Sequence, residues 1–156
     1  MSFEDNGDGT VSDSNTGLMW QQDPGSVKMT WDEAIDGAEN FSLGGYDDWR
    51  LPSIKELYSL IDFSGTDPSG YEGSDTSGLI PFIDSTYFNF GYGDTSDQER
   101  IIEAQDASST LYVSNTTNDG GQTLSGVKLA DGRITGYGLN MLSKAKNFNV
   151  FCTRCH

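Results

Sequence analysis

Histidine and cysteine are almost absent from this sequence, which has one histidine and two cysteines in 156 residues. All three lie at the end of the chain, as Cys152, Cys155 and His156. A Ser-His-Asp or Cys-His catalytic site would therefore need the last residue to fold back into a pocket. The HExxH, P-loop and GxSxG motifs are also missing. We do not expect an enzyme.

Basic residues are scarce as well. Nine Lys and Arg face 24 Asp and Glu, which gives a formal net charge of −15. So acidic a surface repels phosphate backbones, and we expect no nucleic-acid binding. It also repels sulfated glycans and anionic membranes, whereas it suits divalent cations, neutral sugars and basic partners, or serves solubility alone.

Long apolar runs are missing too. No segment approaches the roughly 18 consecutive apolar residues of a membrane span, so we expect no membrane insertion. Polar residues follow Met1 directly, where a signal peptide would be apolar. Either the chain is cytosolic or Met1 stands where a signal peptide has been removed. The length fits one domain, residues 1–156.

Glycine is abundant, with 19 residues, and predicts short elements joined by tight turns. The segments "NGDG" and "SNTG" predict a β-hairpin followed by a strand over 18–20. Capping boxes at 30–33 and 53–56 predict the starts of two helices. Apolar residues recur at helical spacing after each box, and Gly44–Gly45 are predicted to end the first helix. The predicted buried positions are Trp31, Ala34, Ile35, Ala38 and Phe41 in the first helix and Ile54, Leu57, Tyr58 and Ile61 in the second.

The middle of the chain predicts little regular structure. Residues 64–109 are rich in Gly, Ser, Asp and Thr and predict one long acidic loop region, which in a compact domain is either functional or disordered. Strands are predicted again at 110–117 and within 121–138, the latter folded at a two-residue Asp131–Gly132 turn. "FNVFC", residues 148–152, predicts the last strand. This order of elements indicates a single α+β domain.

Several segments together resemble one family, the C-terminal domain of the Legionella collagen-like protein. The most specific is "GYDDWRLP", followed by the Lys-Glu-Leu of the second helix. The resemblance covers nearly the whole chain, apart from an enlarged middle loop. The matching segments are "DNGDGTVSDSNTGLMWQ", "TWDEA", "LGGYDDWRLPSIKEL", "LYVSNTT", "DGRITGY" and "VFCTR".

The resemblance implies a C-type-lectin-like fold, with two helices packed on a small, mostly antiparallel sheet and a long loop region that carries ligands. It implies a secreted, periplasmic or cell-surface module without catalytic residues, which binds a glycan or a cell-surface protein; a homo-oligomer is left open. It also implies a cysteine in the first helix that pairs with the C-terminal one. Ala38 or a neighbour holds that place here, so Cys152 lacks such a partner. Trp20, Trp31 and Trp49 are predicted to be core residues.

The middle loop is the predicted ligand-binding surface. Its carboxylates predict a calcium site, because Ca²⁺ takes carboxylate and carbonyl oxygens, and its aromatic rings are suited to pack on sugar faces. A solvated loop without ligand is the alternative. The predicted ligand-binding residues are Tyr71, Tyr87, Tyr92 and Asp94, and the predicted metal ligands are Asp67, Glu72, Asp75 and Asp97.

The C-terminal "CTRCH" supports a different function. It fits the C-x-x-C-H rule for c-type haem, with Cys152 and Cys155 as thioether positions and His156 as the axial ligand. A monohaem electron-transfer protein is therefore the alternative to a binding module. A small, strained Cys152–Cys155 disulfide and two free thiols are the other readings of the same residues.

Overall fold

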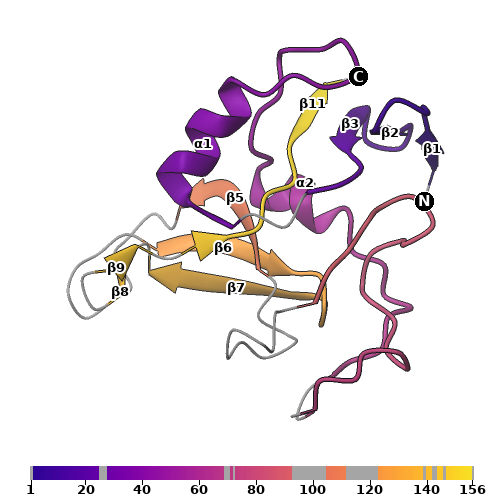
Figure 1. The fold of residues 1–156 in the computed structure, drawn as a ribbon, viewed down its shortest axis with the longest axis vertical. Coiled ribbons are helices and arrows are strands. Elements are labelled where there is room, and N and C mark those ends of the chain that lie inside the picture. Colours follow the sequence, from indigo (N-terminus) through magenta and orange to yellow (C-terminus); the bar gives the residue numbers. More distant parts are fainter. Residues whose placement is uncertain are drawn as a thin grey trace.

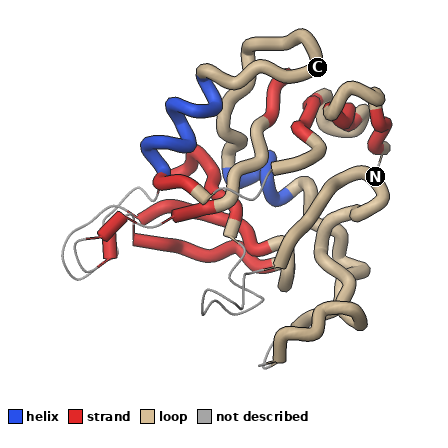
Figure 2. The backbone as a smooth tube through the Cα atoms, in the orientation of Figure 1, coloured by secondary structure: helices blue, strands red, loops and turns tan. Residues whose placement is uncertain are grey.

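The computed structural model describes residues 2–24, 28–68, 71, 73–92, 105–111, 123–138, 140–141, 144–145 and 147–155. Within them the chain forms two helices and small antiparallel sheets, which confirms the predicted α+β class (Figures 1 and 2). A four-stranded and a three-stranded sheet lie in different parts of the molecule. In the described part of the chain, no helix is long and apolar enough to cross a membrane.

The four-stranded sheet joins the two ends of the chain. Its antiparallel order is β1-β2-β3-β11, with β1 at Phe3–Asp5, β2 at Thr10–Asp13, β3 at Leu18–Gln21 and β11 at Thr153–Cys155. Gly7, Gly9 and Gly17 have positive φ in the two connecting turns, as those turns require. The predicted hairpin and the predicted strand at 18–20 are confirmed.

The three-stranded sheet consists of β5 (Asp106–Leu111), β6 (Thr123–Lys128) and β7 (Arg133–Gly138). Its β6–β7 turn differs from the predicted two-residue turn, because Lys128 pairs with Arg133 and four residues lie between them. The reason is Leu129, which is buried in the core and whose carbonyl accepts a bond of 2.7 Å from the amide of Phe82. Strand β5 also begins at Asp106, inside the region predicted as loop.

Two short strand pairs complete the described sheets. Strand β4 (Met29–Thr30) pairs with β10 (Asn147–Phe148), and β8 (Asn140–Met141) pairs with β9 (Lys144–Ala145). Strand β4 leads directly into the first helix, so its pairing with β10 holds the start of that helix against the C-terminal part of the chain.

Both predicted helix starts are confirmed. Helix α1 covers Trp31–Glu39 and helix α2 covers Ile54–Tyr58, and each begins with a complete capping box. Both contact β5, and α2 also contacts β6 (Figure 1). Helix α1 ends earlier than predicted, because Gly44 and Gly45 instead form a tight turn with φ of 62° and 83° that closes the Leu43–Tyr46 bridge.

The tryptophans lie inside the molecule, as predicted. Trp20 and Trp49 are buried, and the half-buried Trp31 donates its indole N–H to the carbonyl of Ser108 at 3.0 Å. Tyr58 is a correction to the predicted buried face of α2, because 37% of it is exposed. Helix α2 has only five residues, so it cannot turn all of its predicted apolar side chains toward the core.

The last strand is also placed differently from the prediction. Residues 148–152 were expected to form it, but β11 starts at Thr153. Thr153 is held on both sides: it pairs with Trp20 of β3 and exchanges two backbone bonds with Arg50, of 2.9 and 3.0 Å. Two partners far away in the sequence therefore select the strand, and local β-propensity does not.

Phe82 fixes the described part of the middle loop to the β6–β7 turn. A Cβ placed on Gly65 or on Gly132 would lie only 2.6 Å from the Phe82 ring, so the ring has glycine on both sides. The segment 62–66 runs beside 80–82 through bonds from Asp62 N to Phe82 O (2.9 Å) and from Thr66 N to Ile80 O (2.7 Å).

Candidate functional site

The tyrosines predicted to bind ligand lie in separate environments. The hydroxyl of Tyr71 donates to the Asp75 carbonyl at 3.1 Å. The Tyr87 ring packs against Phe3, and the Tyr92 ring packs edge-on against Phe90, with centroid distances of 5.8 and 4.9 Å. Burial raises the pKa of the Tyr92 hydroxyl. Asp94, predicted as the fourth member of this set, lies outside the described residues.

Two of the four predicted metal ligands can be placed. Asp67 forms an exposed ion pair with Arg133 at 3.3 Å, and Asp75 accepts the amide of Ser77 at 3.0 Å, a bond that lowers the pKa of its carboxyl group. Glu72 and Asp97 lie outside the described residues. Among the residues that the structure describes, no three acidic, cysteine or histidine side chains meet closely enough to hold a metal ion.

The two cysteines have opposite surroundings. Cys152 is 4% exposed in a cluster with Met19 and Ala38, and burial raises the pKa of its thiol to about 12. Ala38 or a neighbour holds the helix position at which the family resemblance implies a partner cysteine. Cys155 is exposed on β11, opposite Leu18.

A Cys152–Cys155 disulfide does not fit this backbone. Residues 153–155 are extended, so the two Cα atoms lie roughly 10 Å apart at about 3.3 Å per residue. A disulfide tolerates about 7 Å at most. Both thiols are free in the structure.

The positions of the two cysteines also bear on haem attachment. One porphyrin would need both sulfur atoms on its edge, yet Cys152 belongs to a packed apolar cluster and Cys155 lies on the surface. His156, the proposed axial ligand, lies outside the described residues. The two described positions therefore do not fit a covalently bound haem without unpacking of Cys152.

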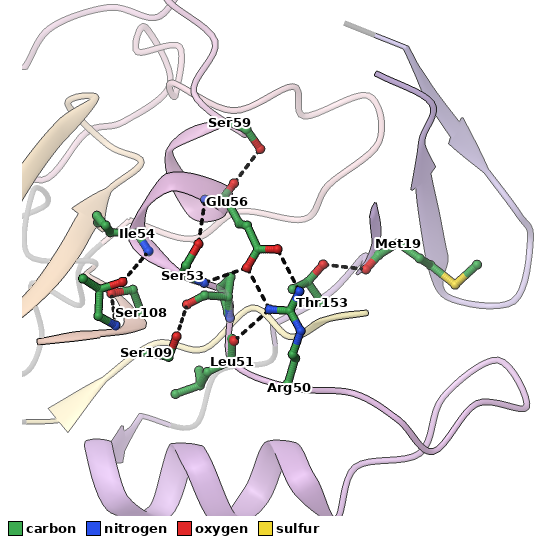
Figure 3. Close-up of polar contacts among 12 residues, drawn as sticks. Met19, Arg50, Leu51, Ser53, Ile54, Glu56, Ser59, Ser108, Ser109 and Thr153 are labelled. Atoms are coloured by element: carbon green, nitrogen blue, oxygen red, sulfur yellow. Dashed lines mark hydrogen bonds and ion pairs between the residues drawn. The ribbon is translucent and has the colours of Figure 1, made fainter. Parts of the chain in front are cut away.

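A charged pair organises the surface next to Cys155. Arg50 faces Glu56 fork to fork, with NH1–Oε1 and NH2–Oε2 distances of 2.7 Å (Figure 3). The Glu56 carboxylate also accepts the Ser53 amide at 2.9 Å as part of the α2 capping box. The Arg50 bonds lower the pKa of Glu56 to about 2, and the same bonds raise the pKa of Arg50.

Helix α2 borders a shallow groove of about 300 Å³, here called the helix groove. Its lining combines one apolar wall, one ammonium group, hydroxyls and the Glu56 side chain, whose carboxylate is already engaged by Arg50. The hydroxyl of Ser59 donates to the carbonyl of Glu56 and keeps its lone pairs as acceptors. The lining residues are Thr16, Leu18, Lys55, Glu56 and Ser59.

A larger hollow of about 410 Å³ lies on the N-terminal hairpin and is here called the hairpin hollow. Its lining offers three serine hydroxyls, two carboxylates and one aromatic ring, and none of the lining residues is basic. The carboxylate of Asp13 is buried and oriented by bonds from Asn15 N (3.0 Å) and Thr16 Oγ1 (2.8 Å). The lining residues are Ser2, Phe3, Glu4, Ser12, Asp13, Ser14 and Gly17.

Both depressions share the turn from Asp13 to Leu18. Asp13, Ser14 and Gly17 line the hairpin hollow, whereas Thr16 and Leu18 line the helix groove. Tyr87, one of the predicted ligand-binding residues, does not line the hairpin hollow but contacts the ring of Phe3, which does. No sequence motif marks this turn as a site, although its dense run of Ser, Asp, Asn and Thr is visible in the sequence.

One protein-family model matches almost the whole chain. The family model for the Lcl C-terminal domain matches residues 9–154. The comparisons with curated proteins and with solved structures found no match.

Proposed function

Because this chain belongs to the Lcl C-terminal domain family, we propose that it is a non-catalytic ligand-binding or adhesion module of the cell envelope or cell exterior. Its ligand is a neutral glycan, bound at the hairpin hollow. The observation that carries this proposal is the lining of the hollow, in which hydroxyls and carboxylates surround one aromatic ring.

The chemistry of the lining matches a sugar. Carboxylates such as those of Glu4 and Asp13 accept hydrogen bonds from sugar hydroxyls, and serine hydroxyls both donate and accept. The ring of Phe3 offers an apolar face to the C–H groups of a pyranose. Phe3 is itself braced by Tyr87 and Phe88, at centroid distances of 5.8 and 5.1 Å, so the ring is held in place before a ligand arrives.

Charge selects among glycans. The chain carries a formal charge of −15, and none of the hollow's lining residues is Lys or Arg. A sulfated or carboxylated glycan would meet repulsion both from the whole molecule and at the site. A neutral oligosaccharide carries no such cost, which makes it the preferred ligand class.

Calcium is proposed as an accessory at the middle loop, away from the hollow. Asp67 and Asp75 are exposed carboxylates of that loop, and Glu72 and Asp97 are the other members of the proposed set. A bound calcium ion would stabilise the folded state by mass action. The test is the melting temperature in excess calcium and in excess chelator: equal values would refute the calcium part and leave the glycan part standing.

Binding is tested by calorimetric titration of neutral and sulfated oligosaccharides of equal length. We expect the neutral ligands to bind and the sulfated ones not to bind. Ser14→Trp fills the hollow from an exposed position and should abolish binding, whereas Ser42→Trp, at an exposed serine outside the lining, should not. Glu4→Gln should weaken binding by about tenfold, the loss of one charge-assisted hydrogen bond.

Two results would contradict this proposal. Binding that survives Ser14→Trp would remove the hollow from the proposal. Failure of the wild-type protein to bind any neutral glycan, together with saturable binding to a basic protein, would make the chain a protein-binding module instead.

A further inference from the structure

Phe63 is the most exposed large apolar side chain in the described part of the chain, at 70%. Its ring contacts the Tyr58 ring edge to face, with centroids 6.1 Å apart and an interplanar angle of 71°. Tyr58 is itself 37% exposed at the end of α2. An aromatic pair left open to solvent offers apolar surface that a ligand can bury.

The backbone holds Phe63 outward in a fixed turn. Asp62 N donates to the Phe82 carbonyl at 2.9 Å, and Phe82 is anchored in turn to Leu129 by its own amide. The Oδ1 atom of Asp62 accepts both the amide and the hydroxyl of Ser64, at 3.0 and 2.7 Å. These bonds lock the residues on either side of Phe63 and present its ring to solvent.

Asp62 adds a carboxylate directly before Phe63 in the chain. Its bonds from Ser64 lower the pKa of the carboxyl group, so the side chain is ionised at neutral pH. Both of these bonds end on Oδ1, which keeps Oδ2 as an acceptor for an incoming hydroxyl. An aromatic face beside a carboxylate acceptor matches the two faces of a neutral sugar, one apolar and one rich in hydroxyls.

We propose that Tyr58, Asp62 and Phe63 form a second sugar-binding subsite, which makes the ligand of this protein a polysaccharide chain that spans several sugar units. We place the subsite beside the helix groove because Tyr58 follows the groove-lining Lys55 by three residues on α2, a spacing that puts both on the same side of the helix. The groove and the hairpin hollow both take lining residues from the Asp13–Leu18 turn. The path that we infer for an extended chain runs from the hollow over the Asp13–Leu18 turn and the groove to the aromatic pair.

This inference rests on the proposed glycan-binding function, and the experiment separates the two. A disaccharide and a hexasaccharide of the same neutral sugar are titrated into the wild-type chain, Phe63→Ala and Ile80→Ala. Ile80 is 55% exposed and serves as the matched control, because its substitution removes exposed apolar surface without removing a ring.

We expect Phe63→Ala to weaken hexasaccharide binding by about tenfold, which equals about 1.4 kcal/mol, and to leave disaccharide binding within about twofold. Ile80→Ala should change neither. Asp62→Asn should weaken the hexasaccharide selectively as well. If the wild type binds both sugars and Phe63→Ala binds them equally well, the second subsite is wrong and the proposed function stands. If the wild type binds neither sugar, both are wrong.

Discussion

The guanidinium of Arg50 and the carboxylate of Glu56 meet fork to fork, with two N–O distances of 2.7 Å. Glu56 serves two structures at once, because the same carboxylate caps α2 through the amide of Ser53. Arg50 also has a double role, since its backbone pairs with Thr153 of β11. The pair therefore couples the start of a helix to the C-terminal strand.

We predict from this coupling that the folded chain loses stability in acid. The pKa of Glu56 is about 2 in the folded chain, below the ordinary value of 4.5, so its stabilisation is present above pH 4.5 and is lost as the pH falls toward 2. The pair is partly exposed, which limits the effect to roughly 1 to 2 kcal/mol. Urea unfolding at pH 6 and pH 3 measures it. Glu56→Gln should flatten this pH dependence, and an unchanged slope in that variant would contradict the assignment.

For Asp106 we predict the opposite pH dependence of stability, a loss as the pH rises. It is buried on β5, and desolvation raises its pKa from 3.8 to about 8. The neutral acid is favoured in the folded chain, so its contribution is complete below pH 4 and declines as the pH rises to about 8. Asp106→Asn should remove this decline in urea unfolding measured from pH 5 to pH 8. The exposed Asp47→Asn is the control and should keep it.

We predict that the backbone position of Gly132 does not accommodate a side chain. Its φ is +71°, and an added Cβ would lie 2.6 Å from the ring of Phe82. Gly132→Ala combines backbone strain with overpacking and should lower the free energy of unfolding by roughly 2 to 4 kcal/mol. Gly78 has open space around it, and Gly78→Ala should change stability by no more than about 0.5 kcal/mol. Equal stability of the two variants would mean that Phe82 does not pack on the turn.

We predict that the thiols of Cys152 and Cys155 differ in reactivity. Cys155 is exposed and Cys152 is buried with a raised pKa, so a thiol reagent should modify Cys155 quickly in the native chain. Cys152 should react only after denaturation. Titration with a chromogenic disulfide reagent, with and without denaturant, counts the accessible thiols. Cys155→Ser should leave no fast phase, and a fast phase that persists would show that Cys152 is accessible.

The burial of Cys152 also predicts the outcome of the haem experiment. Protein produced with a periplasmic haem-maturation system should show no Soret band, because attachment at Cys152 requires the apolar cluster with Met19 and Ala38 to open. The absorption spectrum of the purified chain decides this. A Soret band that survives denaturation and disappears in Cys152→Ser would restore the electron-transfer alternative.

Local features of this chain were predictable because their physics is local. A capping box needs four consecutive residues, so both helix starts could be assigned from Thr30–Glu33 and Ser53–Glu56. The turns of the N-terminal hairpin follow in the same way from glycines that take up positive φ. The charge of −15 and the family resemblance likewise required no coordinates.

Errors arose where partners distant in sequence decide the outcome. Gly44 and Gly45 carry a helix-end signal, but they form the turn that closes the Leu43–Tyr46 bridge. The segment 148–152 has the stronger strand pattern, yet Thr153 is the residue that finds backbone partners in Trp20 and Arg50. A local pattern states a preference, and long-range hydrogen bonds override it.

The sequence by itself determined the α+β class, the starts of both helices, the N-terminal hairpin and the net charge on which the proposed ligand class rests. Only the tertiary structure decided where the surface is hollowed and which rings stay exposed. The hairpin hollow joins residues 2–4 to residues 12–17, and Phe63 remains outside the core while Phe82 enters it. A depression and an exposed ring result from how surfaces far apart in the chain pack together, and no short stretch of residues encodes that packing.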